Sequence, residues 1–216
     1  MKTRKMFFLA MFLLALFSSC EQVEAFNDSS SEIEYTVNDG QSQVIAFTSN
    51  PDSITENEVN GLIIMREEEK LAMDVYTYFY NKYNYRIFGN ISKSENRHTD
   101  AVLNLINYFK LTDPASASEG SFSNTDFQTL YTKLTSEATT IELALSTGAF
   151  VEEYDIADLN KLIAESKNPD IKRVYINLLN GSGNHLRAFT RVLAGLGVVY
   201  KPTILTLDEY NSILAD

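Results

Sequence analysis

Residues 62–79 read LIIMREEEKLAMDVYTYF, and apolar side chains recur there at alternating steps of three and four. This period predicts an amphipathic helix with one face toward a core. Six residues share that face: Leu62, Met65, Glu69, Ala72, Tyr76 and Phe79. A carboxylate in an apolar stripe is costly to bury unless it is paired or binds a metal. Glu69 is therefore a candidate metal ligand on a core helix.

Glu69 is the last of three consecutive acids that begin at Glu67. Runs of like charge usually form a solvated surface, so the alternative interpretation is an exposed acidic turn. Successive helical side chains point about 100° apart, so we expect at most one or two of the three acids to face inward.

Helical periodicity continues along most of the remaining chain, with a loop predicted for the Ser-rich residues 112–124. Gly181 and Gly183 fall inside the last long helix, where they predict close packing or a kink. The helix predicted over 139–166 carries five apolar residues on one side: Leu143, Ala149, Ile156, Leu159 and Ile163. The predicted helices run from Ser53 or Thr55 to about Tyr83, from Ser92 or Ser94 to about Lys110 after a Gly89-Asn90 break, over 125–137, over 139–166, and from Pro169 to Gly195 or Gly197.

Two helical hairpins joined by a long connection match a four-helix bundle with one crossover, between the second and third long helices. The sequence therefore predicts an all-α, ferritin-like fold. We expect it to occupy residues 53–200, after a signal segment (1–20) and a flexible tether (21–52), with a short strand near 43–48. A C-terminal tail (201–216) is expected to fold back on the helices.

The chain contains two histidines, His98 and His185. His98 follows Glu95 by three residues, so both side chains project from one helix face and can meet one metal ion. On the third long helix Glu152 is in register with the apolar face, and Glu153 beside it is a second candidate. Sequence alone does not separate these two.

His185 has Ser182 three residues before it, where a complete two-metal site would carry a second Glu. Asp155 can compensate for that missing carboxylate, or the site binds a single ion, so an asymmetric site is predicted. The two halves correspond, since Glu69 precedes His98 by 29 positions and Glu152 precedes His185 by 33. The alternative is two histidines that are satisfied by ordinary hydrogen bonds.

The stretch from Glu69 through Ala72 to Tyr76 resembles the first ligand helix of rubrerythrins and other ferritin-like proteins. That resemblance implies an iron-binding Glu69 supported by Tyr76. Residues 56–200 further resemble a ferritin-like domain family of unknown function, family 2202. The residues that carry this likeness are Arg66 to Ala72, Ser94-Glu95-x-x-His98, Gly148 to Leu159 and Gly181 to Phe189. The family implies the fold and supplies no proven activity, and Ser182 is then a family trait.

The amino terminus carries basic residues, an apolar run at Met6 to Phe17, and small residues before Cys20. The run is too short to span a membrane but suits a secretory signal. The order resembles a bacterial lipoprotein signal, which implies lipidation of Cys20, the sole cysteine, and a location at the cell envelope outside the cytoplasm. The alternative is a plain signal peptide cut near Ser19.

The formal net charge of −11 disfavours nucleic acid as a partner and favours cations. Oxygen and imidazole ligands suit iron or manganese, with zinc also an option. We therefore expect a metal-binding lipoprotein, and the sequence leaves open whether it forms a homo-oligomer. The resemblance implies ferroxidase or peroxide-reducing activity, and the alternative is a non-catalytic helical binding or structural lipoprotein.

Overall fold

The computed structural model describes residues 32–37 and 41–215. The predicted signal segment, Cys20 and the first part of the predicted tether lie outside these residues. None of the described helices is both long and apolar enough to cross a membrane. The elements are β1 (Glu32–Val37), β2 (Gln41–Ala46), α1 (Glu56–Tyr83), α2 (Arg86–Tyr108), α3 (Thr125–Glu137), α4 (Ile141–Glu165), α5 (Pro169–Gly195) and α6 (Leu207–Ala215).

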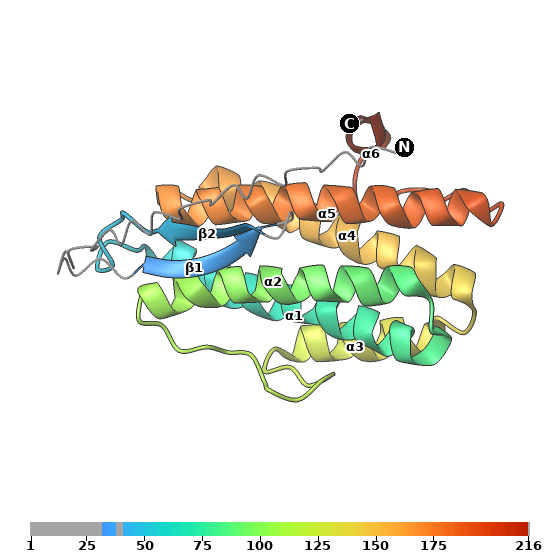
Figure 1. Ribbon diagram of the computed structural model, residues 1–216, viewed down its shortest axis with the longest axis horizontal. Helices are drawn as coiled ribbons and strands as arrows, with labels where there is room; N and C mark the ends of the chain where they lie inside the picture. Colours follow the sequence, from blue (N-terminus) through green and yellow to red (C-terminus); the bar gives the residue numbers. More distant parts are fainter. Residues whose placement is uncertain (1–31, 38–40, 216) are drawn as a thin grey trace, which may run out of the picture.

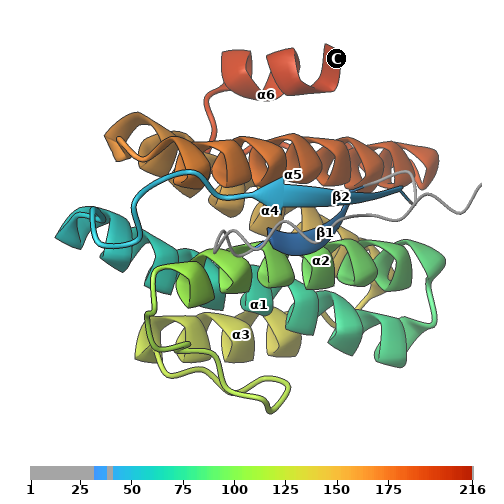
Figure 2. The ribbon, with the colours of Figure 1, turned by 60° about the vertical axis from the view of Figure 1, so that its left-hand side comes forward.

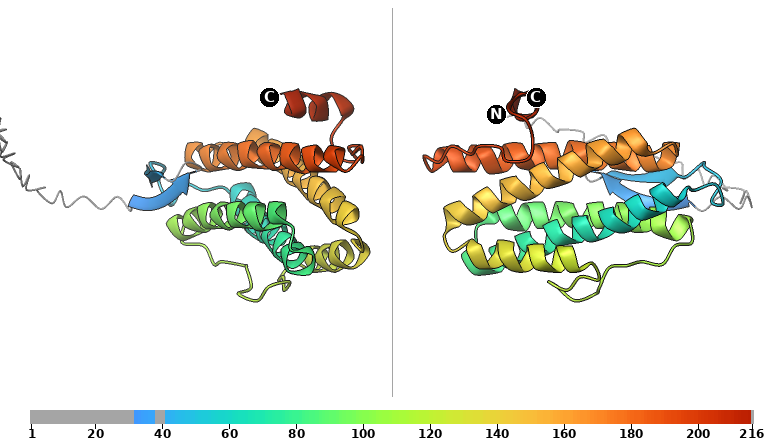
Figure 3. Two further views of the ribbon diagram at one scale, coloured as in Figure 1. Left: turned by 45° about the vertical axis from the view of Figure 1, so that its right-hand side comes forward. Right: turned by 180° about the vertical axis from the view of Figure 1, so that it is seen from behind.

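The four longest helices, α1, α2, α4 and α5, pack together along the molecule (Figure 1). α1 pairs with α2 and α4 pairs with α5, and the pairs meet through α1 with α4 and α2 with α5. α3 packs on α1 and α4, on the side away from α5, and α6 lies outside α5 (Figure 2). α4 runs obliquely from beside α3 to α5 (Figure 3). The strands β1 and β2 pair antiparallel, Glu32 opposite Ala46.

A polar layer divides the core into two apolar clusters. One cluster includes Tyr76, Phe88 and Phe189, and the other includes Leu62, Leu105 and Leu178. Along α1, α2 and α5, the positions between the clusters carry buried polar residues: Glu69, Glu95, His98, Ser182 and His185. Buried polar groups are costly without partners, so this layer is where the sequence departs from simple core packing.

α1 begins at a cap that the sequence provides. The Thr55 side chain accepts a hydrogen bond from the Glu58 N–H, and the Glu58 carboxylate accepts one from the Thr55 N–H. This capping box satisfies N–H groups that the first helical turn leaves free. The helix ends at Asn84, whose φ of 48° lies in the left-handed region that Asn tolerates better than most residues. All six residues of the predicted face are buried.

The prediction that at most one or two of the three consecutive acids of α1 face inward is wrong. Glu67, Glu68 and Glu69 are all buried. The Glu67 carboxylate accepts hydrogen bonds from the N–H groups of Ser123 and Asn124, at the start of α3. The expectation of one or two inward acids fails because α3 and the loop before it cover a face of α1 that a bare helical pair would leave in water.

The predicted start of the second helix is also wrong. α2 begins at Arg86, well before Ser92, and Gly89 lies inside it. A Cβ at Gly89 would come within 2.9 Å of the Tyr80 ring. The glycine therefore permits a close approach of α2 to α1, and the chain reverses earlier, at Asn84.

The remaining helices lie close to their predicted bounds. α3 spans 125–137 as predicted, Thr140 caps α4, and Asn168 caps α5 with Pro169 in the first turn. Leu143 was predicted to lie on the apolar side of α4, and this is wrong, since 47% of the residue is exposed. The buried face of α4 passes instead through Ala144 at this level.

Residues just before α1 contact the helices. Phe47 is buried against Tyr108, with ring centroids 5.0 Å apart. The N–H groups of Thr48 and Ser49 donate to the Asp170 carboxylate at 2.8 and 2.7 Å. The last residues of the predicted tether are thus fixed to the start of α5. The strand β2 overlaps the strand that the sequence predicted near 43–48.

Candidate metal centre

Glu69, Glu95 and His98 form the first group of converging ligand atoms. Glu69 lies on α1, and the other two lie one turn apart on α2. The His98 Nδ1 atom is 2.8 Å from Glu95 Oε2 and 3.3 Å from Glu69 Oε2. All three residues are buried, and their ligand atoms lie within 4.8 Å of one another.

Glu95, Glu152 and His185 form the second group, from α2, α4 and α5. The His185 Nδ1 atom is 2.7 Å from Glu95 Oε1 and 3.5 Å from Glu152 Oε2. The two imidazole rings stack beside each other, with centroids 5.5 Å apart. Glu95 is therefore shared, with one carboxylate oxygen beside each histidine.

These short contacts lack hydrogen-bond alignment. The Nδ1 atoms of His98 and His185 and one oxygen each of Glu69 and Glu95 are buried without a hydrogen-bond partner among the residues that the structure describes. A buried polar atom without a partner costs free energy, so a set of such atoms calls for an explanation. Converging nitrogen and oxygen lone pairs match the donor set of a transition-metal ion.

Tyr76 supports the second group. Its hydroxyl lies 2.6 Å from Glu152 Oε1 and 3.2 Å from the Gly148 carbonyl oxygen. The bond to Glu152 holds one carboxylate oxygen, so the other oxygen points at His185. The Tyr76 ring is fully buried among Phe88 and Phe189, which fixes the hydroxyl.

Ser182 and Asp155 lie beside the two groups without belonging to either. The Ser182 hydroxyl donates to Asp155 Oδ2, and Asp155 Oδ1 is buried with no hydrogen-bond partner in the part of the chain that the structure describes. Ser182 thus orients a carboxylate from α4 at the position where the sequence lacks one on α5.

Glu153 is placed elsewhere. Its carboxylate accepts hydrogen bonds from the Tyr200 hydroxyl and from the N–H groups of Thr203, Ile204 and Leu205. The structure therefore separates the two acids that sequence left open: Glu152 joins the converging ligands, and Glu153 ties the C-terminal segment to α4.

Burial and mutual charge shift the pKa values of the cluster. Burial raises the pKa of Glu69 to about 7, although His98 opposes the shift. Burial disfavours the charge on Glu95 as well, but His185 and His98 outweigh it and hold the Glu95 pKa well below its usual range. In return Glu95 and Glu152 raise the pKa of His185 to about 9, against the effect of burial. The carboxylates thus favour positive charge at both histidines.

Residues 58–216 match the family described as an uncharacterized protein domain, DUF2202. The chain belongs to this family. The resemblance to family 2202 seen in the sequence is therefore confirmed.

Two comparisons show relatives of this DUF2202 chain. It is 48% identical over 164 residues to the uncharacterized protein MJ0754 of Methanocaldococcus jannaschii, a match that covers 75% of this chain and 89% of the relative. A crystal structure of the hypothetical protein MJ0754 has a similar fold, with a TM-score of 0.75 and 47% identity over 78% of this chain and 98% of that one.

The sequence predicted close packing or a kink at Gly181, and the structure confirms close packing there, although the sequence did not predict that His98 is the neighbour. A Cβ at Gly181 would come within 2.6 Å of the His98 ring, so this glycine makes room for a candidate ligand. The sequence signal for this close contact was a glycine inside a helix, next to Ser182. The sharing of Glu95 had no sequence signal, because it depends on how α2 faces α4 and α5.

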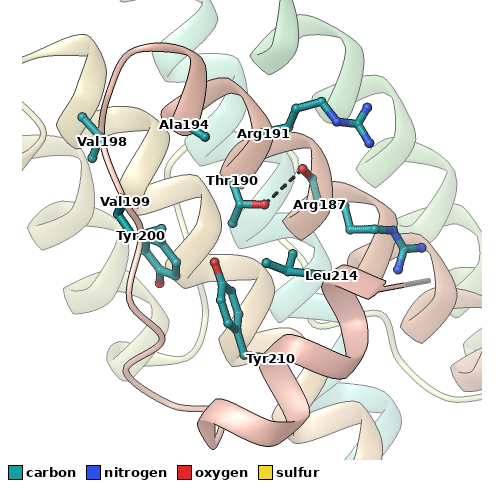
Figure 4. A pocket seen from close by; sticks show the side chains of 9 residues that line it. All are labelled: Arg187, Thr190, Arg191, Ala194, Val198, Val199, Tyr200, Tyr210 and Leu214. Carbon is teal, nitrogen blue, oxygen red and sulfur yellow. Dashed lines mark hydrogen bonds between the residues drawn. The ribbon is translucent and has the colours of Figure 1, made fainter.

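A separate pocket of about 400 Å³ lies between α5 and the C-terminal segment (Figure 4). Its lining includes Arg187, Arg191 and Tyr210, and the Thr190 hydroxyl inside it donates to the Arg187 carbonyl oxygen. It contains none of the converging ligands.

Proposed function

We propose that this protein binds two metal ions that share Glu95, one at the Glu69 and His98 group and one at the Glu152 and His185 group. The observation that carries the proposal is the position of Glu95, whose two oxygens face different histidines at 2.8 and 2.7 Å. A carboxylate that bridges two ions needs this arrangement. Ordinary hydrogen-bonded histidines would not leave both Nδ1 atoms without aligned partners among the residues described.

The donor set favours iron. Carboxylate oxygens with imidazole nitrogens suit iron and manganese, and zinc accepts the same ligands. Charge supports cation binding, since Glu69, Glu95, Glu152 and Asp155 are at most 5% exposed. Four buried carboxylates would repel one another, and two divalent cations would offset that repulsion.

We infer that the helices form a ferritin-like four-helix bundle with a crossover between α2 and α4. The pairing of α1 with α2 and of α4 with α5, with α3 in the connection, supports this topology. Candidate ligands come from all four long helices, as in carboxylate metal sites built inside such bundles.

The activity that follows from this proposal is ferroxidase or peroxide reduction. Bound iron would supply the electrons for either reaction. The protein's part is to hold Glu69, Glu95 and Glu152 in place as charge changes, and to exclude water through the apolar clusters on both sides. Tyr76 keeps Glu152 oriented through its hydroxyl.

We further propose that Cys20 carries a lipid that anchors the protein to the cell envelope, facing out of the cytoplasm. Its place at the end of a basic and apolar leader supports this. Cells labelled with a fatty-acid analogue should yield labelled wild-type protein and unlabelled Cys20→Ser. Equal labelling of the two would reject the anchor.

The metal proposal is tested by anaerobic reconstitution with ferrous iron, followed by removal of loose iron and elemental analysis. We expect up to two irons per chain in the wild type and loss of most iron in Glu95→Ala. Glu142→Ala, at the partly exposed start of α4, is the matched control and should keep the wild-type iron content. Wild-type protein that holds neither iron, manganese nor zinc would reject the proposal.

One observation favours a second candidate, a helical binding or structural protein without redox chemistry. Ser182 stands where a second carboxylate ligand would stand on α5, and it contacts Asp155 rather than either histidine. Turnover of ferrous iron or peroxide by the metal-loaded protein decides between the two. Tight metal binding with no turnover above free iron would favour the non-catalytic protein.

A further inference from the structure

Glu68 is a buried acid that the proposed metal centre does not use. Only 2% of it is exposed, and neither carboxylate oxygen has a hydrogen-bond partner among the described residues. Its neighbour Glu67 is just as buried, yet both Glu67 oxygens accept backbone N–H groups. The difference indicates that the Glu68 carboxylate serves a function other than stabilising the fold.

The acids opposite Glu68 form a ladder along α4. Glu152, Asp155 and Asp158 recur every three residues, a spacing that brings each side chain beside the next on the helix surface. The ladder spans about 9 Å along the axis. Exposure changes along it: Glu152 and Asp155 are buried, and Asp158 is partly exposed. It therefore leads from the centre to the surface.

Glu68 lies on α1, which packs against α4, and the charges of the ladder act on it. Burial raises the pKa of Glu68 well above its usual value, and so does the charge of Asp158. Burial also raises the pKa of Asp155, with added effects from the charges of Glu69 and Glu68. The charges of these acids thus act on one another, and one Asp155 oxygen has no hydrogen-bond partner among the described residues. Exposed Lys161, one turn beyond Asp158, is the cation that acts on the outer end.

We propose that Glu68, Asp155 and Asp158 line the route by which divalent cations reach the Glu95-bridged centre, between α1 and α4. This inference rests on the proposed metal function. Glu68 belongs to no group of three described ligands within 4.8 Å, so it offers a transient stop rather than a closed site. Weak, successive carboxylate contacts let an ion shed water stepwise and move on, whereas a closed cage would trap it.

The test uses cobalt(II) as the probe, because its visible absorption changes when water is replaced by protein ligands. Stopped-flow mixing of metal-free protein with cobalt gives the loading rate, and equilibrium titration gives the number of ions bound. Glu68→Gln should load about tenfold or more slowly than the wild type, within the range of electrostatic focusing. It should bind the same number of ions at equilibrium.

Glu67→Gln is the matched control, with the same charge change one residue away on a carboxylate occupied by α3, and it should load at the wild-type rate. Asp158→Asn, which is safer for folding because its side chain is partly exposed, should also slow loading. Its effect should shrink as salt rises, because exposed charges are screened.

The outcomes separate the two proposals. A wild-type loading rate in both Glu68→Gln and Asp158→Asn would overturn the route and leave the metal centre standing. Loss of a bound ion in Glu68→Gln would also overturn it, since Glu68 would then be a ligand. Wild-type protein that takes up no cobalt and no iron would reject the centre and the route together.

Discussion

Glu95 contributes to both ligand groups, so its loss should affect both ions. Glu95→Ala removes an oxygen from His98 and from His185, whereas Glu152→Ala removes one only from the His185 group. We expect Glu95→Ala to lower the affinity for both ions and Glu152→Ala to lower mainly that of the second. Isothermal titration of each variant with ferrous iron under nitrogen measures this. A smaller loss of affinity in Glu95→Ala than in Glu152→Ala would contradict the shared position of Glu95.

The two groups should also differ in the wild type. Glu69 has an oxygen with no hydrogen-bond partner within residues 32–37 and 41–215, whereas one oxygen of Glu152 is held by Tyr76. Glu69 can therefore give more charge to its ion, and Ser182 gives the second group a neutral hydroxyl nearby instead of another carboxylate. The same titration should resolve one tight and one weaker ion per chain. Two ions of equal affinity would argue against this asymmetry.

Glu58 is the residue whose charge most clearly stabilises the fold. Burial alone would raise its pKa, but hydrogen bonds from Thr55, Asn168 and Lys167 lower it to about 2. The lowered pKa means that this stabilisation is complete above the unfolded value of 4.5 and is lost as pH falls toward 2. Glu58→Gln should cost about 1.5–3 kcal/mol at pH 7, as hydrogen bonds to charged groups do.

Urea denaturation of wild type and Glu58→Gln at a series of pH values checks this. The difference in free energy of unfolding should shrink between pH 4.5 and 2. Glu56→Gln, exposed in the same first turn, should show a much smaller difference at every pH. A difference that does not change with pH would show that the Glu58 charge is not the cause.

At the level of the helices, α2 and α5 pack closely at Gly181. Gly181→Ala would place a methyl group 2.6 Å from the His98 ring, so the ring must shift or the helices must separate. We expect a loss of about 1–3 kcal/mol in stability, as for other overpacked sites, and weaker metal binding. Thermal unfolding and metal titration measure the two effects.

Gly183 offers the control on the same helix. A Cβ there meets only Ile213 at 3.8 Å, an ordinary contact. Gly183→Ala should therefore keep metal binding and gain up to about 1 kcal/mol from better helix propensity. Equal stability changes in the two variants would mean that the contact with His98 does not constrain the helices.

Much of this arrangement of elements follows from local sequence. Periodicity and caps predict α3 and the starts of α1 and α5, because Thr55 and Pro169 act within a single turn. The three-residue spacing of Glu95 and His98 likewise predicts that they share a face. The predictions that fail depend on contacts between elements. Gly89 suits a turn as well as a helix by sequence, and only its close contact with Tyr80 explains its place inside α2.

The burial of the acids follows the same rule. Glu67 and Glu68 become interior only because α3 and α4 cover α1. Glu153 was as good a candidate as Glu152 until the C-terminal segment was seen to occupy its carboxylate. A helical pattern tells which residues share a face and leaves open what covers each face.

At the scale of the whole molecule, bound metal should stabilise the fold. A ligand that binds only the folded chain adds about 2.7 kcal/mol when its free concentration is a hundredfold above its dissociation constant. The histidines must lose their protons to bind, and the His185 pKa is about 9. Metal affinity should therefore rise as pH rises toward 9 and fall in acid. Differential scanning calorimetry with iron and with chelator at pH 6 and pH 8 measures both effects.

Anomalous X-ray diffraction at the iron edge, on crystals of the iron-loaded protein, tests directly whether Glu95 bridges two metal ions. We expect two peaks inside the helices, one between Glu95 and His98 and one between Glu95 and His185, with the second weaker. The peak near His98 should persist in Glu152→Ala. Iron-loaded crystals with no peak beside Glu95, or with iron bound only at the surface, would contradict a two-metal centre bridged by Glu95.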